Sequence, residues 1–252
     1  MRITFLGGGR VVRIILRGLK RAGKLPGDVM VCDPDKESLR LLEDEFRVKT
    51  SGDCRAPEGD VIFLALHPPV LKDVLGKLES PDPESLIVSL APKIRIQEIQ
   101  EALSHKRVAR VIPNAPSIVN RGYNPFSAAD EITGTDLKRL RSLFEPLGDF
   151  QEVSEDKLEA YAVITAMGPT YLWFQLDELE RLAVEFGMAP DEAATAVHSM
   201  ASGAVEVLYK HPDRDVVMDL IPVKPLEGAE DDIRTIYRKR LKPLYSGLTE
   251  GK

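Results

Sequence analysis

The first stretch whose residue types could bind a ligand consists of three consecutive glycines near the amino terminus. They follow a short apolar run and precede an apolar, arginine-dotted stretch. A turn of this kind between a strand and a helix lets the backbone approach a pyrophosphate, which the unpaired N–H groups of the helix attract. The predicted pyrophosphate contacts are Gly7, Gly8, Gly9, Arg10 and Val11. The match to G-x-G-x-x-G is incomplete, because Val12 replaces the third glycine, and a turn without a ligand is the alternative.

An acidic residue follows the second apolar run. Asp33 stands 26 residues after Gly7, where a carboxylate can accept hydrogen bonds from the adenosine ribose. The same carboxylate would repel a 2′-phosphate, so NADH is slightly favoured over NADPH. Two alternatives stay open: Asp33 starts a helix through an Asp-Pro turn, and Arg10 pairs with a phosphate.

Further candidates follow later apolar runs. Because the carboxyl ends of parallel strands meet at one edge of a sheet, these residues are expected to line the nicotinamide half of a dinucleotide site. They are Leu66, His67, Pro68, Ala91 and Asn114. His67 is alternatively a loop histidine without a catalytic task. Asn114, fixed between Pro113 and Pro116, alternatively caps its own turn.

The elements that position these residues alternate between strand and helix. Continuous apolar runs predict buried parallel strands, at residues 2–6, 28–32, 60–66, 85–90 and 107–112. Helical periodicity is found at residues 10–21, 35–46, 69–78 and 94–103. The fold class is therefore α/β, with a Rossmann-type doubly wound parallel sheet in a dinucleotide-binding domain over residues 1–152. The region 124–151 is expected to add a hairpin-like edge pair around a helix at 135–144.

The remainder of the chain, residues 153–252, is predicted to be an all-α domain for substrate binding and dimerisation. Two long helical patterns, at 169–186 and 191–209, are apolar around much of their circumference, and the second is rich in alanine. Such helices need wide burial, which favours a homodimer or higher homo-oligomer. The alternative is that both helices pack only on their own chain. A loop and a basic final helix complete this part.

Composition excludes several function classes. The net charge of -6 argues against nucleic-acid or membrane-surface binding, and long apolar stretches that would cross a membrane are missing. The chain enters a strand at once, which leaves no room for a signal peptide, so a cytoplasmic location is expected. Cys32 and Cys54 are predicted to be free thiols, and the scattered histidines predict no metal site.

Taken in order, these motifs resemble those of the pyrroline-5-carboxylate reductase family. The family reads G-x-G-N-M-G, A-V-K-P, S-I-A-A-G and R-x-M-P-N-T-P, where this chain has GGGRVV, LHP, SLA and RVIPNAP. Further on, the segment TAMGPTY, residues 165–171, falls where the family has S-G-S-G-P-A-Y. The resemblance covers roughly residues 1 to 215.

The resemblance implies hydride transfer from NADH or NADPH to a small cyclic imine, in proline biosynthesis, by an oxidoreductase with an interlocked helical dimer domain. Thr165, Met167 and Gly168 would face the substrate, with Thr170 nearby. This chain differs clearly from the family at the substrate loop, where the family's S-P-G-G-T-T is replaced by DLIPVK at residues 219–224. Lys224 could replace the lost groups or point to solvent. Thr165, Thr170 and Lys224 are therefore the candidate catalytic residues.

Two other functions compete with this interpretation. The lost loop is compatible with a non-catalytic or regulatory relative that keeps the nucleotide-binding fold. Arg10 beside the phosphate loop leaves room for a deazaflavin (F420)-dependent NADP oxidoreductase, since related Rossmann domains use that cofactor.

Overall fold

The computed structural model describes residues 1–250 and divides the chain into two compact units. The first unit comprises Met1–Met167 and the chain from Tyr245 onward, and the second comprises Gly168–Leu244. Residues 153–167, which sequence analysis assigned to the helical domain, belong to the first unit. Each unit is described by itself below.

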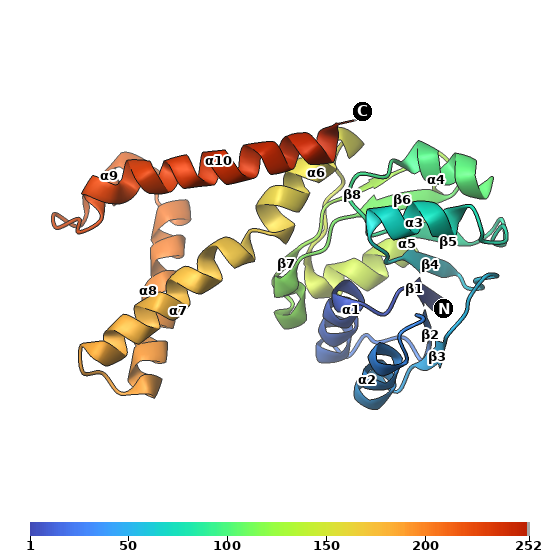
Figure 1. Cartoon of the computed structure of the whole chain (residues 1–252), viewed down its shortest axis with the longest axis horizontal. Helices are drawn as coiled ribbons and strands as arrows, with labels where there is room; N and C mark the ends of the chain where they lie inside the picture. The colour runs from blue at the N-terminus through green and yellow to red at the C-terminus, as the bar shows by residue number, and fades with distance from the viewer. Residues whose placement is uncertain (251–252) are drawn as a thin grey trace. The chain divides into compact units, whose positions relative to one another are not determined.

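A seven-stranded sheet forms the centre of the first unit (Figure 1). Its strands are β1 (Arg2–Leu6), β2 (Asp28–Cys32), β3 (Lys49–Ser51), β4 (Val61–Leu64), β5 (Leu86–Ser89), β6 (Val108–Val111) and β8 (Phe126–Ala128). The spatial order is β3-β2-β1-β4-β5-β6-β8, and every pair is parallel except β6 with β8. The order reverses between β1 and β4, so the predicted Rossmann-type, doubly wound sheet is confirmed, with one antiparallel edge strand.

Helices cover both faces of this sheet. They are α1 (Arg10–Arg21), α2 (Lys36–Phe46), α3 (Pro68–Leu75), α4 (Ile96–Leu103) and α5 (Gly134–Phe144). Alternate strand residues point to opposite faces, so Val61 and Phe63 of β4 pack in the cluster that contains α1, α2 and α5. Ile62 and Leu64 pack in the cluster that contains α3 and α4. Figure 1 shows α3 and α4 on one face of the sheet and α1 and α2 on the other. All four β4 side chains are buried, as the continuous apolar run predicts.

A second, two-stranded sheet corrects one expectation. Strands β7 (Gly122–Tyr123) and β9 (Gly148–Asp149) flank α5 in the sequence and pair in parallel. The predicted hairpin-like pair is therefore wrong in direction. The physical reason is that α5 lies between the two strands and forms a crossover, which returns the chain in the same direction.

The segment before Met167 packs on the end of the main sheet. It contains a 3₁₀ turn at Glu155–Lys157, α6 (Leu158–Tyr161) and a π-helical turn at Ala162–Ala166. Leu158 and Ala162 form a buried cluster with Ile112, the residue after β6. This burial explains why residues 153–167 belong to the first unit.

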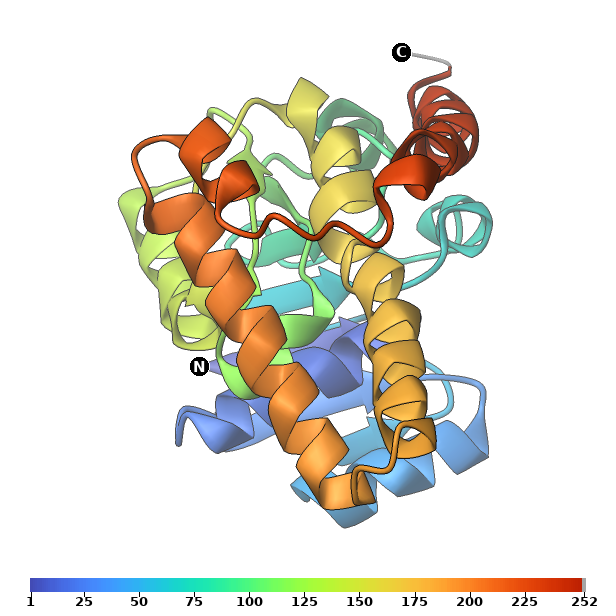
Figure 2. The same ribbon diagram turned by 90° about the vertical axis from the view of Figure 1, so that its left-hand side faces the viewer.

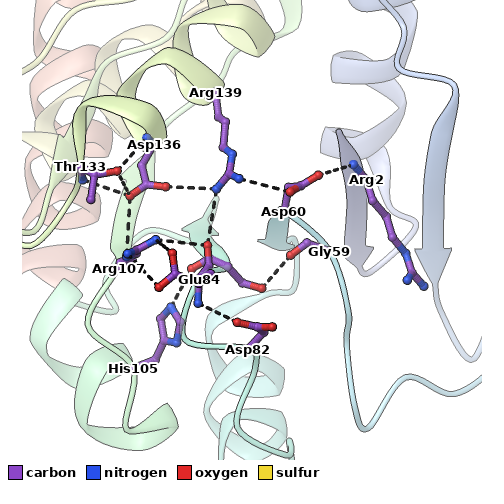
Figure 3. Close-up of polar contacts among 11 residues, drawn as sticks. Arg2, Gly59, Asp60, Asp82, Glu84, His105, Arg107, Thr133, Asp136 and Arg139 are labelled. Atoms are coloured by element: carbon purple, nitrogen blue, oxygen red, sulfur yellow. Dashed lines mark hydrogen bonds and ion pairs between the residues drawn. The ribbon is translucent and has the colours of Figure 1, made fainter.

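A network of paired charges closes the amino edge of the main sheet (Figure 3). Asp60, just before β4, accepts a hydrogen bond from the Arg2 N–H at 2.7 Å and pairs with Arg139 of α5 at 3.2 Å. Arg139 also pairs at 3.3 Å with Asp136, which is fully buried and forms a capping box with Thr133. These carboxylates face guanidinium groups or N–H donors of the same network, so we interpret this edge as structural.

The second unit is entirely helical, which confirms the all-α prediction. It contains α7 (Pro169–Glu185), α8 (Pro190–Lys210), α9 (Arg214–Asp219), a 3₁₀ turn at Glu227–Ala229 and most of α10 (Glu230–Thr249). Figure 2 shows α7 and α8 as two long helices that meet at the short turn joining them and diverge away from it. Every residue of α7 is at least partly exposed, and the buried residues of α8 are Ala193 and Val197.

Candidate functional site

The glycine loop lies where the strand order reverses, which is where open α/β sheets bind ligands. Gly7 adopts a φ of 104°, and a Cβ on this residue would lie 2.5 Å from the Ala65 carbonyl oxygen. Glycine is therefore required here both by conformation and by the close approach of the chain after β4. The Gly7 N–H donates to the Cys32 carbonyl at 2.7 Å, which fastens the loop to the end of β2.

The amino terminus of α1 presents its N–H groups to open space. Gly9 is the N-cap residue, and because it has no side chain it cannot cap the helix. A Cβ built on Gly9 would meet no atom within 4 Å among the described residues. Uncapped helix N-termini attract anions through their free N–H groups and the helix dipole. Arg10, exposed in the first turn, adds a positive charge at the same place.

Asp33 connects the glycine loop to the next helix. Its Oδ2 accepts the Gly8 N–H at 2.7 Å, and its Oδ1 accepts the Asp35 N–H at 2.8 Å. The bond to Asp35 is the local turn that sequence analysis held open as the alternative role. Each carboxylate oxygen can accept a second hydrogen bond, so the turn and a ribose contact are compatible. Gly8 is consequently turned toward Asp33, with its N–H engaged there.

Two clefts meet at the glycine loop and form one groove along the carboxyl edge of the sheet. The larger, of about 700 Å³, holds most of the predicted cofactor residues: Gly7, Gly9, Arg10, Val11, Asp33, Leu66, His67, Pro68, Ala91 and Asn114. The smaller, of about 470 Å³, lies on the β2–β3 side and contains Pro34, Cys54 and Leu78. Gly7, Asp33, Leu66 and Val70 line both clefts. The clefts adjoin at Gly7, and the amino terminus of α1 lines the larger one, an arrangement that suits a ligand with two halves joined by a pyrophosphate.

The wall of the smaller cleft contains a disulfide between Cys32 and Cys54, with a Cα–Cα distance of 5.9 Å. The prediction of two free thiols is therefore wrong. The physical reason is the pairing of β2 with β3, which places Cys32 opposite Ser51 and brings the chain just beyond β3 back to the end of β2. A separation of 22 residues gives no hint of this contact.

The loops after β4 and β5 form the far wall of the larger cleft. His67 is exposed and is the N-cap residue of α3, with Pro68 as the first residue of that helix. Ala91 is buried just beyond β5, and its N–H lies 3.3 Å from the Ser89 hydroxyl. This wall is mainly apolar, apart from the exposed imidazole.

Asn114 joins two segments behind this wall. Its Nδ2 donates to the Thr165 carbonyl at 3.2 Å, and its Oδ1 accepts the Tyr123 N–H at 3.0 Å. The Asn114 side chain does not cap its own turn. Its amide bridges to residues 123 and 165, and its predicted contact with a ligand stays a prediction. It lines the cleft while holding the π-helical turn in place.

The π-helical turn carries Thr165, whose hydroxyl donates to the Tyr161 carbonyl at 2.8 Å. The next residues, Ala166 and Met167, line the larger cleft together with Pro92 and Pro113. Single π-turns are common at functional sites. The sequence predicts Met167 at this site but gives no signal for Ala166 and Pro92, which are small or apolar.

The remaining predicted site residues belong to the second unit. Thr170 is exposed in the first turn of α7, and Lys224 is exposed in the loop between α9 and the Glu227–Ala229 turn. The Lys224 carbonyl accepts the Glu227 N–H at 3.1 Å. The catalytic roles of Thr165, Thr170 and Lys224 stay predictions.

A buried ion-pair network behind the site was missed in the sequence. The Arg110 guanidinium on β6 binds Glu159 at 2.7 Å and Glu155 at 3.0 Å, and the side chains of Arg110 and Glu159 are each only 1% exposed. The Lys93 N–H also donates to Glu159, at 3.1 Å. This network fixes α6 to the sheet about two turns before Ala166 and Met167, which line the cleft.

Within residues 1–250, no helix combines the length and apolar character that crossing a bilayer requires. The same residues contain no group of three or more His, Cys, Asp or Glu side chains arranged to hold a metal ion.

Comparison with known proteins finds similarity to oxidoreductases. The family model described as "NADP oxidoreductase coenzyme F420-dependent" matches residues 2–93. The pyrroline-5-carboxylate reductase of Escherichia coli is 26% identical over 219 residues, covering 84% of this chain and 81% of that protein. The corresponding enzyme of Corynebacterium melassecola is 27% identical over 213 residues, covering 82% and 79%.

Solved structures agree with these relatives. The Plasmodium falciparum pyrroline carboxylate reductase with NADP bound has a TM-score of 0.80 at 19% identity, over 98% of this chain and 95% of that one. The Coxiella burnetii pyrroline-5-carboxylate reductase has a TM-score of 0.71 at 25% identity, over 98% and 94%. The fold of this chain is therefore shared with both structures.

Proposed function

We propose that this chain, a divergent relative of the pyrroline-5-carboxylate reductases, is an NAD(P)H-dependent oxidoreductase that reduces the C=N bond of a small cyclic imine. Pyrroline-5-carboxylate, whose reduction gives proline, is the first substrate to test, because the relatives carry that name. The observation that carries the proposal is the uncapped amino terminus of α1, whose Gly9, Arg10 and Val11 line the larger of two adjacent clefts.

The residues of the groove fit a dinucleotide. The free N–H groups at the start of α1 and the Arg10 guanidinium would bind the pyrophosphate. Asp33 would accept hydrogen bonds from the adenosine ribose, which assigns the smaller cleft to adenosine and the larger to nicotinamide. When bound, the reduced nicotinamide supplies the hydride. Leu66, Pro68 and Ala91 would exclude water from that half of the groove.

The imine nitrogen also needs a proton during reduction. The Thr165 hydroxyl has one proton, which it donates to the Tyr161 carbonyl, so it would have to rotate before donating to a substrate. Thr170 and Lys224 are the other candidates. Replacing each of the three separately and comparing kcat with KM would assign the role.

Asp33 favours NADH over NADPH in this proposal. Its carboxylate would lie close to an approaching 2′-phosphate, and like charges at short distance repel. The neighbouring Arg13 could offset this repulsion, but its guanidinium is directed to Ser38, with Nη2 at 3.4 Å from the hydroxyl. Because this guanidinium is engaged with Ser38, it should leave the preference for NADH in place.

The decisive assay follows the loss of reduced-nicotinamide absorbance with pyrroline-5-carboxylate, using NADH and NADPH in parallel. We expect turnover by the purified protein and its loss in Gly9→Glu. Dinucleotide binding without turnover on pyrroline-5-carboxylate or other cyclic imines would support a non-catalytic relative instead. Absence of both binding and turnover would refute the proposal.

A deazaflavin-dependent oxidoreductase is the second candidate function. It is favoured by the family model that matches residues 2–93, the first half of the Rossmann unit. The discriminating observation is reduction of a deazaflavin by NADPH in the presence of the protein. If that reaction proceeds and imine reduction does not, the second candidate replaces the first.

We further propose that the protein is a homodimer through its helical unit. Trp173, Phe174 and Phe186 of the α7 region are 54%, 66% and 80% exposed in the single chain. Burying one such side chain stabilises an assembly by roughly 1.5–3 kcal/mol. A second copy is the proposed occupant, because α7 and α8 are both apolar on exposed sides and small residues on α8 allow close helix packing.

Light scattering after size exclusion tests the oligomer. We expect a mass of two chains or more for the wild type and a shift toward one chain for Phe174→Asp, with Glu178→Gln as a control. A monomeric wild type at micromolar concentration would refute the dimer.

A cytoplasmic location remains part of the proposal, because a reductase of this kind draws NAD(P)H from the surrounding pool.

A further inference from the structure

The Cys32–Cys54 disulfide lies in the groove itself. Cys32 is the last residue of β2 and directly precedes Asp33, the proposed ribose contact. Cys54 follows β3 in a loop that lines the smaller cleft, together with Val74 and Leu78. The disulfide is therefore a covalent bridge within the wall of the proposed adenosine site.

The bridge can be reached from the cleft. Cys32 is only 6% exposed, whereas Cys54 is half-buried in the cleft lining. Thiol–disulfide exchange begins with attack of a thiolate on one sulfur and depends on access to it. Cys54 is the sulfur that an incoming thiolate would meet first.

We propose that the Cys32–Cys54 pair is a reversible redox modification site, reduced by a dithiol, that adjusts the affinity of the adenosine half of the groove. One dithiol thiolate attacks the Cys54 sulfur, and the Cys32 thiolate leaves. The second thiol then displaces Cys54 from the mixed disulfide. The dithiol becomes a disulfide, having passed two electrons and two protons to the pair, which becomes two thiols. The inference rests on the proposed function only for the identity of the ligand.

Reduction removes the covalent bond that holds the loop after β3 against β2. Bonded sulfurs lie about 2 Å apart, whereas unbonded heavy atoms in contact need about 3.5–4 Å, so the Cys32 and Cys54 sulfurs would separate by roughly 1.5–2 Å. Other bonds hold the loop near its ends. The Ser51 hydroxyl donates to the Asp53 carbonyl at 2.6 Å, and the Glu79 N–H donates to the Arg55 carbonyl at 2.8 Å. The displacement is therefore concentrated around Cys54, where the adenine would pack.

A displaced wall lowers affinity, because ligand binding must then reorder the loop. We expect reduction to weaken dinucleotide binding about fivefold, within the range of ordering costs for a short segment. Linkage is reciprocal, so bound dinucleotide should disfavour reduction of the disulfide by the same factor. The larger cleft, which does not contain either cysteine, should be unaffected.

The test compares the protein before and after treatment with dithiothreitol, with thiols counted by alkylation and mass spectrometry. Dissociation constants are measured for NADH, for AMP as a probe of the adenosine half, and for nicotinamide mononucleotide as a probe of the other half. We expect weaker NADH and AMP binding after reduction and unchanged nicotinamide mononucleotide binding. Cys54→Ser should bind NADH and AMP as weakly as the reduced protein, and dithiothreitol should not change its affinity. The Cys54→Ala variant provides the same comparison if serine disturbs folding.

Three results would overturn the proposal. The first is two free thiols in the protein purified without reductant. The second is equal NADH and AMP affinity in both redox states, which refutes the switch and leaves the dinucleotide site intact. The third is failure of both states to bind NADH, NADPH or AMP, which refutes the switch together with the proposed function.

Discussion

Replacement of Gly9 by glutamate should weaken dinucleotide binding while leaving the stability of the fold nearly unchanged. The N-cap position faces open space, because a Cβ there would meet no atom within 4 Å among the described residues. Its φ of -74° and extended ψ suit any amino acid. A glutamate at this position should therefore enter the fold without strain.

The magnitude follows from the charge that the new carboxylate brings to the pyrophosphate. At an effective dielectric constant of about 20, two unit charges about 5 Å apart repel by about 3 kcal/mol. Screening by salt at this exposed position reduces the repulsion to roughly 2 kcal/mol. Such a loss weakens dinucleotide binding about 30-fold.

Stability should respond differently, because an acidic side chain is favourable near a helix N-terminus by about 0.3–1 kcal/mol. This gain opposes the preference for glycine over most other residues at an N-cap position, which is worth up to roughly 1 kcal/mol. We expect the free energy of unfolding of Gly9→Glu to stay within about 1 kcal/mol of the wild type.

Titration calorimetry at two salt concentrations, with urea unfolding alongside, measures both quantities. The matched control is Gly9→Gln, which brings similar bulk without charge and should lose less affinity, with less dependence on salt. Unchanged dinucleotide affinity in a folded Gly9→Glu protein would refute the placement of the pyrophosphate.

Three further predictions concern other parts of the first unit. Asp33→Ser should raise the NADPH-to-NADH affinity ratio about tenfold, since it removes a charge near the 2′-position. Calorimetry with both cofactors measures the ratio, and a constant ratio contradicts the ribose assignment. Arg110→Met should destabilise the fold by about 3 kcal/mol, because Glu159 stays buried without its guanidinium, and adding Glu159→Met should restore most of the loss. Urea unfolding measures the free energy of unfolding of each variant. Equal stability of Arg110→Met and of the double variant would argue against the buried pair. The hydrogen bond from Arg17 lowers the pKa of Glu45, so this carboxylate stabilises the fold above its ordinary pKa, and the contribution is lost as pH falls through the lowered value. Because Glu45 and Arg17 are 35% and 46% exposed, Glu45→Gln should cost under about 1 kcal/mol at neutral pH and nothing in acid. A difference that persists at low pH would contradict the pairing.

The main sheet could be predicted from the sequence, because local periodicity decides most of it. The buried runs at Val61–Leu64 and Leu86–Ser89 are apolar without alternation, and only a sheet covered on both faces accommodates such strands. The clustering of Gly7, His67, Ala91 and other loop residues along one groove then follows from parallel strand direction.

Contacts between distant segments could not be predicted. The Asn114–Thr165 bond and the Arg110–Glu159 pair join residues 51 and 49 positions apart, and their local sequence contains nothing that specifies the partner. The disulfide depends on the pairing of β3 beside β2, and β3 is a three-residue edge strand with weak patterning. The parallel direction of β7 and β9 likewise emerges only once α5 is recognised as a crossover.

A structure of the protein with an oxidised dinucleotide bound tests the central claim most directly. The account predicts the pyrophosphate at the amino terminus of α1, the adenosine in the cleft beside Asp33 and Cys54, and the nicotinamide beside Leu66 and Ala91. A dinucleotide bound elsewhere, or in the reverse orientation along the groove, would contradict it.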